Sequence, residues 1–358
     1  MKKLVTLFLI LSSFVLVAQT NHHLEKKVDK LQRNNEKLRH RLDVLQKKID
    51  DVIWFERMEE VAFIDKIYIT GPPNPNGITN KTAMGVNNPI KFWSYVFIPK
   101  NIDLNKKYPL MVFPHGGVHG DFSTYYTHIV KELMYQGYIV IAPEYRGSTG
   151  YGEGHYKKID YGGLENEDVY NARNHMIENY NFIDEDRVGI FGWSHGGMIT
   201  LFNLFNHPDA YQVGYAGVPV SDIISRMGYQ DDGYRALYSA KYHIGKTAQE
   251  NIAEYRRRSP AWNTHKFQNT PLLIHTNTND DDVNVLEVEH LIKSLKADGK
   301  KFEYKIYKDI EGGHSFDRID TPIAKKIRVK IYKHLAKYLK PSRPIKSVKD
   351  IFNAAYLK

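Results

Sequence analysis

The sequence predicts an α/β fold whose mostly parallel sheet carries helices on both faces. Short continuous apolar runs recur along the chain, and such runs are typical of parallel strands covered on both faces. Helical stretches lie between these runs, and this alternation of strands and helices indicates a parallel sheet. No repeat with a period of roughly 20–50 residues is present, which excludes a propeller or a solenoid within this chain.

The expected elements follow one another along most of the chain. After a strand-like start at Ile64, strands are expected at 92–98, 110–113, 138–142, 188–191, 213–217, 272–275 and 302–307. Helices are expected at 122–136, 164–180, 195–206, 284–298 and 321–340. Together they predict one globular domain over residues 60–340, which fits a chain of 358 residues with appended segments.

The composition is that of a soluble globular protein, with 42% hydrophobic and 25% charged residues. The absence of cysteine excludes disulfides, cysteine nucleophiles and thiolate metal sites. His22 and His23 are too isolated to form a metal site, so no metal or other cofactor is expected.

The net charge of +9 is concentrated at the C-terminus. Between Lys325 and Lys358 eleven Lys or Arg residues stand against the single Asp350. We expect residues 341–358 to form a basic tail. Because no nucleic-acid-binding motif accompanies it, we interpret this charge as a solvated surface and expect no nucleic-acid partner.

The first residues have the pattern of a signal peptide. Lys2 and Lys3 precede an apolar run over 4–18, and Ala18 is a small residue at a cleavage point before Gln19. A membrane anchor is the alternative, but the run is shorter than the ~20 apolar residues that a spanning helix needs. Residues 1–18 are therefore predicted to be a cleaved signal peptide of a secreted or periplasmic protein.

Residues 21–53 predict a coiled-coil helix. Its d positions are Leu24, Leu31, Leu38, Leu45 and Val52, and its a positions are Val28, Asn35, Leu42 and Ile49. Leucine at d with one Asn at an a position is typical of a two-stranded parallel coiled coil, which predicts a homodimer. The alternative is a single amphipathic helix folded onto its own domain. Asn35 favours the dimer, since an intramolecular helix has less use for a polar residue in its seam.

A candidate nucleophile stands between an expected strand and an expected helix. Residues 192–196 read Gly-Trp-Ser-His-Gly, a G-x-S-x-G pattern in the strand–turn–helix context of a nucleophile elbow. Only glycines fit on either side of the serine in so tight a turn. The pattern predicts that Ser194 projects above the sheet at a helix N-terminus, where developing negative charge is stabilised.

A serine nucleophile needs a general base and a carboxylate that orients it. After the expected strand at 272–275 come three successive candidates for the acid: Asp280, Asp281 and Asp282. After the strand at 302–307 comes His314, in a glycine-containing loop. Both segments follow strand carboxyl ends, where open α/β sheets assemble their ligand sites. His314 is the predicted base.

The loop after the strand at 110–113 is a candidate oxyanion hole. It reads His115-Gly116-Gly117, and such a loop can present backbone N–H groups to a tetrahedral intermediate. One donor is assigned to the N–H of His195, directly after the nucleophile. The other is assigned to Gly117 or Val118, which the sequence does not separate.

These segments together resemble the catalytic domain of the prolyl oligopeptidase family of serine peptidases, which has the α/β-hydrolase fold. The resemblance covers about residues 95–339, and its stretches are 115–117, 144–152, 192–197, 216–222, the acid turn and 313–314. The family's acid usually stands three residues before a valine, which implies Asp280 from Val283; Asp281 stays an alternative because the turn is one residue longer.

The resemblance implies hydrolysis of oligopeptides through an acyl-enzyme with a Ser–Asp–His triad. Family members commonly carry a β-propeller before the catalytic domain, and fewer than a hundred residues precede it here. A carboxylesterase acting on esterified polysaccharide or small esters is therefore the alternative, because it shares the fold and triad. A non-catalytic binding protein is a third interpretation, and the intact Ser, Asp and His argue against it. The expected partner is a peptide or ester substrate.

Residues after the strand at 213–217 are candidates for the substrate pocket. The four side chains assigned to an acyl or proline-sized pocket are Val218, Pro219, Ile223 and Tyr229. Arg226 in the same segment has two interpretations. It pairs either with a substrate carboxylate or with a neighbour such as Asp222.

Overall fold

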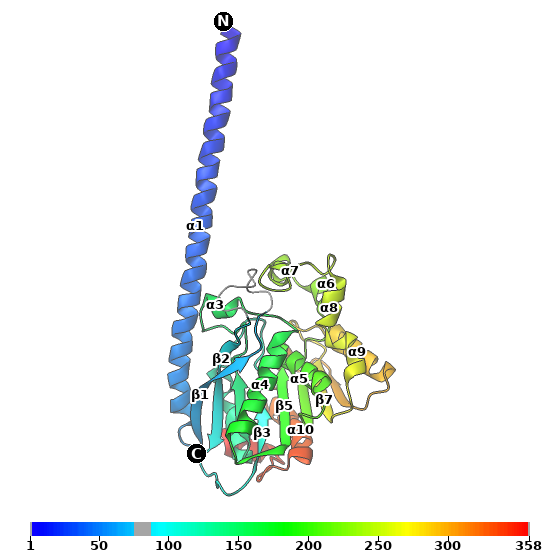
Figure 1. Cartoon of the computed structure of the whole chain (residues 1–358). Helices are drawn as coiled ribbons and strands as arrows, with labels where there is room; N and C mark the ends of the chain where they lie inside the picture. Colours follow the sequence, from blue (N-terminus) through cyan, green and yellow to red (C-terminus); the bar gives the residue numbers. More distant parts are fainter. Residues whose placement is uncertain (1, 75–86, 357–358) are drawn as a thin grey trace.

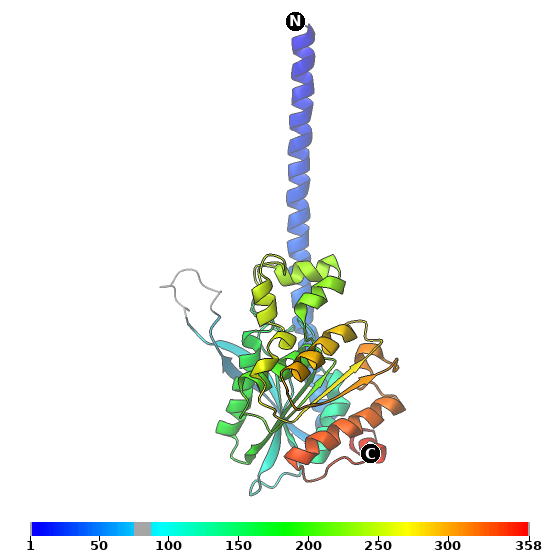
Figure 2. The same ribbon diagram turned by 90° about the vertical axis from the view of Figure 1, so that its right-hand side faces the viewer.

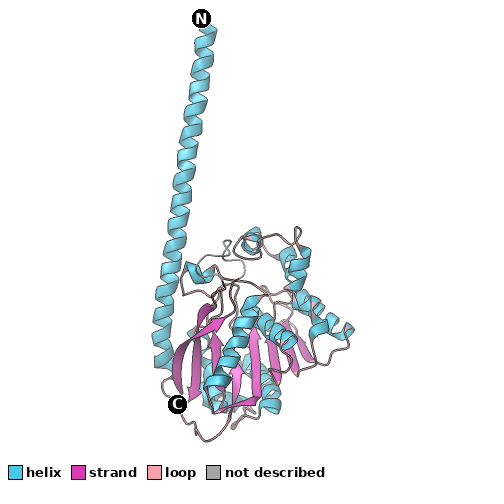
Figure 3. Cartoon of the chain, viewed as in Figure 1, coloured by secondary structure: helices cyan, strands magenta, loops and turns pink. Residues whose placement is uncertain are grey.

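The computed structural model describes residues 2–74 and 87–356, with side chains from residue 22 onward. Its centre is an eight-stranded sheet with the order β1-β2-β4-β3-β5-β6-β7-β8 (Figure 3). The strands are β1 (Ala62–Gly71), β2 (Ile90–Pro99), β3 (Tyr108–Val112), β4 (Ile139–Pro143), β5 (Ile183–Trp193), β6 (Val213–Gly217), β7 (Leu272–Asn277) and β8 (Glu303–Tyr307). The β1–β2 and β2–β4 pairs are antiparallel and the other pairs are parallel, so the predicted fold class is confirmed.

Helices cover both faces of the sheet (Figures 1 and 2). One face carries α4 (Leu164–Asn179), α5 (His195–Asn206) and α9 (Val285–Ala297), and the other carries α2 (Thr127–Gln136), α10 (Pro322–Leu339) and α11 (Val348–Ala355). Their apolar side chains form two hydrophobic clusters separated by the sheet. The central strands β3, β4 and β6 are almost wholly buried, which explains their continuous apolar sequences.

The N-terminal helix α1 (Lys2–Met58) is continuous and projects far beyond the domain (Figures 1 and 2). The side chains of residues 1–21 lie outside the description, so the signal peptide stays a prediction. Among the described residues, no helix has a stretch long and apolar enough to cross a membrane.

The apolar heptad positions of α1 do not face the domain. We call them the seam: Leu24, Val28, Leu31, Leu38, Leu42, Leu45, Ile49 and Val52, each between 51% and 68% exposed. The opposite side of the helix, the domain face, lies on the domain through buried His40, Lys47, Trp54 and Met58. The helix therefore lies on its own domain, as in the alternative to the coiled coil, but through other positions than its apolar heptad residues.

The C-terminal residues 341–356 do not form the expected tail. Ile345 and Ile351 are fully buried and join the cluster around α2 and α10. Helix α11 begins with a capping box between Ser347 and Asp350, which fixes its first turn. Ile345 and Ile351, with Val348, Ala354 and Tyr356 packed against the same cluster, anchor this segment to the domain. The count of basic residues did not reveal them.

Three short helices between β6 and β7 lie near the carboxyl ends of the parallel strands (Figures 1 and 2). They are α6 (Ile223–Tyr229), α7 (Asp232–Ser239) and α8 (Ile252–Arg257). Each begins with an Asp or Asn side chain that accepts from a backbone N–H of the first turn. Helices α6 and α7 contribute to one wall of the candidate site.

Candidate active site

Ser194 lies at the sharp turn between β5 and α5. Its backbone has φ 59° and ψ −122°, a conformation that is strained for a residue with a side chain. A Cβ on Gly192 would lie 2.5 Å from the carbonyl oxygen of Gly196, and one on Gly196 would lie 2.4 Å from that of Pro114. Only glycine fits at these two positions, and the turn sets Ser194 at the N-terminus of α5, as in a nucleophile elbow.

His314 and Asp280 come together from loops that follow the neighbouring parallel strands β8 and β7. The His314 Nδ1 lies 2.8 Å from Asp280 Oδ2 and 3.0 Å from Oδ1. Asp280 Oδ1 also accepts hydrogen bonds from the backbone N–H groups of Asp282 and Val283. Asp281 is exposed and is not the carboxylate at this nitrogen. The contact orients the ring through Nδ1, so that Nε2 is the nitrogen left for proton transfer.

Ser194 and His314 lie at the same edge of the sheet, because β5 to β8 run parallel. Among the described residues no hydrogen bond joins the two side chains. The His314 Nε2 lies 3.6 Å from Asp282 Oδ2 instead. Hydrogen bonds between catalytic groups are often long without substrate and shorten in the reacting complex.

The predicted oxyanion donors lie beside Ser194. The N–H of His195 is the first of α5, and the first N–H groups of a helix have no acceptor within it. The His195 Nδ1 lies 3.0 Å from the carbonyl oxygen of Gly117, so the His-Gly-Gly loop contacts the residue after the nucleophile. Gly117 and Val118 both line the cavity that contains Ser194, and either N–H remains a candidate for the second donor.

A cavity of about 290 Å³ opens beside Ser194. The other residues that line it are Gly117, Val118, His119, Tyr156, Tyr161, His195, Val220, Arg226, Tyr234, Leu237 and Asp282. The His119 ring stacks on Tyr156 at 3.5 Å between centroids, and burial lowers the pKa of His119 to about 4. The wall that these two rings form is therefore aromatic and uncharged at neutral pH.

Only Arg226 of the five predicted substrate-binding residues lines this cavity. Val218 and Ile223 are fully buried in the two hydrophobic clusters, and Pro219 is buried as well. Tyr229 is half-exposed, and its hydroxyl donates to Glu287. The sequence analysis missed the residues of α7 and the tyrosines of 156–161, which approach Ser194 only through tertiary folding.

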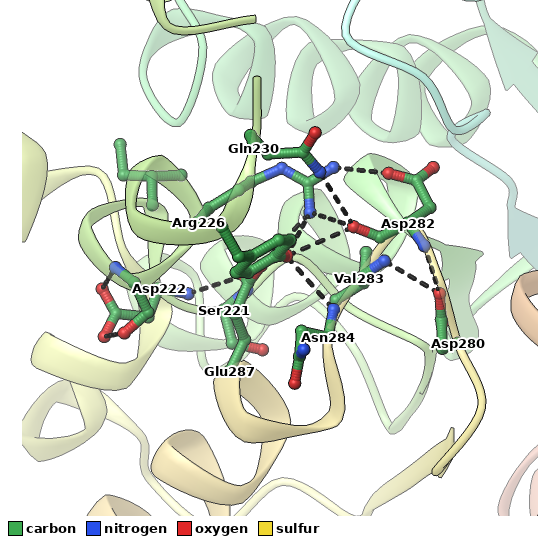
Figure 4. A network of polar contacts seen from close by, with 12 residues as sticks. Ser221, Asp222, Arg226, Gln230, Asp280, Asp282, Val283, Asn284 and Glu287 are labelled. Carbon is green, nitrogen blue, oxygen red and sulfur yellow. Dashed lines mark hydrogen bonds and ion pairs between the residues drawn. The ribbon is translucent and has the colours of Figure 1, made fainter. Parts of the chain in front are cut away.

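Arg226 is held inside a polar network at the cavity wall (Figure 4). Its Nη2 donates to Asp282 Oδ1 at 2.7 Å, and its Nη1 donates to Glu287 Oε1 at 3.2 Å. Asp222, the predicted neighbour, caps α6 and contacts His290 instead. Burial opposes the charge of Arg226, but Glu287 and three neighbouring tyrosines together outweigh this and raise the pKa of Arg226 well above its usual value. The guanidinium therefore stays charged and paired.

Among the described residues, no group of three or more His, Asp or Glu side chains is arranged to hold a metal ion.

The strand order, the elbow at Ser194 and the loops after β7 and β8 define an α/β hydrolase. Comparison with family models places the chain more narrowly: residues 124–342, more than half of the chain, match the prolyl oligopeptidase family. The chain belongs to this family of serine peptidases. A second model, platelet-activating factor acetylhydrolase isoform II, matches residues 75–158.

Curated relatives share this region. Human dipeptidyl peptidase 8 is 30% identical over 226 residues, which are 60% of this chain and 24% of the relative. Mouse prolyl endopeptidase FAP is 26% identical over 261 residues, which are 70% of this chain and 31% of the relative. The chain thus spans about a quarter to a third of the length of these relatives.

Solved structures show the same fold. An acylaminoacyl peptidase in complex with Z-Gly-Gly-Phe-chloromethyl ketone matches 82% of this chain and 44% of its own, with 22% identity and a TM-score of 0.63. Dipeptidyl peptidase 4 of Porphyromonas gingivalis matches 79% of this chain and 37% of its own, with 22% identity and a TM-score of 0.61.

Proposed function

We propose that this protein is a serine peptidase that cleaves oligopeptides through an acyl-enzyme, with Ser194 as nucleophile, His314 as general base and Asp280 as the orienting acid. The observation that carries the proposal is the Asp280–His314 pair at the sheet edge where the strained elbow places Ser194. Membership of the prolyl oligopeptidase family supports amide bonds as the substrate class.

In the proposed mechanism, His314 Nε2 takes the proton of the Ser194 hydroxyl as its oxygen attacks the substrate carbonyl. Asp280 stabilises the imidazolium that forms. The N–H of His195 and that of Gly117 or Val118 stabilise the oxyanion, and one such donor contributes about 2.7–4 kcal/mol to the transition state. His314 then protonates the leaving amine, and water hydrolyses the acyl-enzyme.

The test is hydrolysis of a panel of chromogenic peptidyl amides and acyl or aryl esters by the wild type and by Ser194→Ala. We expect amide turnover that falls by at least ~10³-fold in the variant. Turnover of neither substrate class by folded wild-type protein would overturn the proposal and favour a binding protein.

A carboxylesterase is the second candidate. The match of residues 75–158 to an acetylhydrolase model favours it, because it covers the segment that contains the His-Gly-Gly loop. A Ser–His–Asp arrangement cleaves esters as well as amides. Ester turnover without any amide turnover, lost in Ser194→Ala, would decide for this alternative.

We further propose that the protein is a homodimer through the seam of α1. An exposed row of leucines with one Asn at an a position supports a two-stranded parallel coiled coil, and so large an apolar stripe on a surface indicates a partner. Light scattering should give twice the chain mass for the wild type and the chain mass for Leu31→Asp/Leu38→Asp. A monomeric wild type at tens of micromolar would exclude the dimer.

For its location we propose secretion or export to the periplasm after removal of residues 1–18. The Lys2-Lys3 pair and the apolar run that follows it support this proposal. Intact mass measurement of the exported protein should give an N-terminus near Gln19. An uncleaved protein, found in the cytoplasmic fraction with residues 1–18 intact, would contradict the proposed export.

A further inference from the structure

Lys47 is a buried cation on the domain face of α1. Its side chain is 2% exposed, although it belongs to the helix that projects from the domain. The ammonium donates to Asp121 Oδ2 at 2.9 Å and to the carbonyl oxygen of Phe122 at 2.7 Å, and it contacts Glu144 Oε1 at 2.5 Å. A buried ammonium is stable only with such a complete set of partners.

Residues 115–122 form the loop that carries the proposed oxyanion donors, and Glu144 lies beside both of its ends. At the start of the loop, Glu144 Oε2 lies 3.4 Å from His115 Nε2, which makes its own hydrogen bond with Ser148 Oγ at 2.8 Å. At its end, both carboxylate oxygens accept from the N–H of Phe122 at 3.2 Å. His115 and Glu144 are fully buried, so these contacts are shielded from solvent.

The charge of Glu144 depends on Lys47. Burial raises the pKa of Glu144 to about 7, and the charge of Lys47 is the strongest influence that opposes this rise. Burial also lowers the pKa of His115 to about 3, so His115 is neutral and supplies no cation. Lys47 is therefore the main counter-charge for the carboxylate that holds the end of the loop.

Neighbouring residues of α1 hold the following segment in the same way. Asp50 accepts from the backbone N–H of Thr124, at 3.1 Å to the nearer oxygen. The Trp54 ring stacks on Phe122, with centroids 5.6 Å apart and an interplanar angle of 8°. Three successive turns of α1 thus contact the end of the loop and Thr124 just beyond it.

We propose that Lys47 is a positioning residue for oxyanion stabilisation. Through Glu144 and Asp121 it fixes residues 115–122, and with them the N–H of Gly117 or Val118, relative to Ser194. Lys47 does not contact the substrate. The inference rests on the proposed function, in which this loop donates to the oxyanion. It makes the N-terminal helix a part of the active-site support.

The test uses the full chain and a fluorophosphonate, which phosphonylates an activated serine without requiring knowledge of the natural substrate. Progress curves at several reagent concentrations give the maximal rate constant kinact and the binding constant KI. We expect Lys47→Met to lower kinact at least ~10-fold with KI unchanged, because loss of one donor affects the transition state. Lys47→Arg, which keeps the cation, should recover part of the rate.

Lys26→Met is the matched control. Lys26 occupies the same heptad position three heptads earlier, where the helix is exposed. Its kinact should equal that of the wild type. A folded Lys47→Met protein with wild-type kinact, or with a change in KI alone, would overturn the inference.

Asp121→Asn decides the question if Lys47→Met does not fold. Asp121 is 30% exposed, so its replacement is better tolerated, and it removes one partner of Lys47. We expect kinact to fall several-fold, and an unchanged kinact would overturn the inference. A wild-type protein that does not react with the fluorophosphonate would instead contradict the proposed function, so the two failures are distinguishable.

Discussion

The two faces of α1 differ in how many of their side chains are buried by contacts within the chain. The seam presents eight large apolar side chains, and all of them are more than half exposed. The domain face has fewer apolar side chains, but Trp54 and Met58 are fully buried and Lys47 is enclosed by carboxylates. One helix thus combines an apolar surface that is exposed in the single chain with a surface that is complete within its own chain.

The difference shows that the heptad repeat of a helix and its attachment to the domain can depend on different residues. The repeating leucines are typical of a helix that pairs with its own copy. The attachment to the domain depends instead on single contacts, such as the stacking of Trp54 on Phe122. Because these sets of contacts share no residue, each can be removed without the other.

The largest expected effect is that of Trp54→Ala. Removing a fully buried tryptophan should lower the free energy of unfolding by about 3–5 kcal/mol. Leu42→Ala on the seam should change it by less than ~0.5 kcal/mol in a monomer, because Leu42 is 65% exposed. Urea unfolding followed by circular dichroism measures both, in the Leu31→Asp/Leu38→Asp background so that dimerisation does not contribute.

Equal costs for the two substitutions would contradict the comparison. A large effect of Leu42→Ala in the monomeric background would mean that the seam packs on the domain in solution. A small effect of Trp54→Ala would mean that the turns of α1 around Trp54 do not pack on the domain in solution.

The next effect concerns pH. The groups around Glu144 are Lys47, Lys66, His115, Asp121, Tyr95 and Tyr151. Burial raises the folded-state pKa of Glu144 to about 7, against about 4.3 when unfolded. The folded state binds this proton more tightly than the unfolded state does. The stabilising contribution of protonated Glu144 is therefore complete below the unfolded-state pKa and is lost as the pH rises through the folded-state pKa.

Lys47→Met should raise the pKa of Glu144 further, because it removes the main opposing charge. Breaking such a buried pair costs roughly 3–5 kcal/mol. We expect the loss to be greater at pH 8.5 than at pH 5.5, where Glu144 can be protonated. Urea unfolding at both pH values tests this, with Lys26→Met as the control. A loss that is independent of pH would show that Glu144 does not depend on Lys47 for its charge.

A smaller change is expected on the seam from Asn35→Leu. A polar residue at one a position fixes the number and register of the helices at a cost in stability. The substitution should tighten association and allow species larger than a dimer, as measured by sedimentation equilibrium. The fluorophosphonate kinact should not change, because Asn35 is exposed and distant from the domain face. Weaker association of the variant would contradict a parallel coiled coil in which Asn35 occupies an a position.

The sequence predicted the sheet well because its central strands β3, β4 and β6 have continuous apolar runs. The expected strand at 213–217 and helix at 195–206 coincide with β6 and α5. The short helices α6 to α8 were missed, since they have fewer than ten residues each and are stabilised mainly by contacts with the rest of the domain. Helix α11 was missed because it has only eight residues and Ile351 is its one fully buried side chain.

The candidate site divides in the same way. Ser194, Asp280 and His314 stand in short motifs at strand ends, and such motifs are visible without a structure. The cavity wall was less accessible, because Tyr161, Tyr234 and Asp282 come from three distant segments. Lys47 has no local signal at all: its partners lie more than seventy residues away, and in the sequence it is one lysine among many.

The smallest effect that we predict is that of Asp50→Ala, and it tests the domain face at its polar edge. Asp50 accepts from the N–H and the hydroxyl of Thr124, a contact similar to a helix cap, and such caps contribute about 1 kcal/mol. Asp43 occupies the same heptad position one heptad earlier, and its ion pair is with His40 of the same helix. Asp43→Ala should therefore cost clearly less than Asp50→Ala in urea unfolding of the monomeric background. Equal costs would mean that Asp50 stabilises the protein through the helix itself and not through its contact with Thr124.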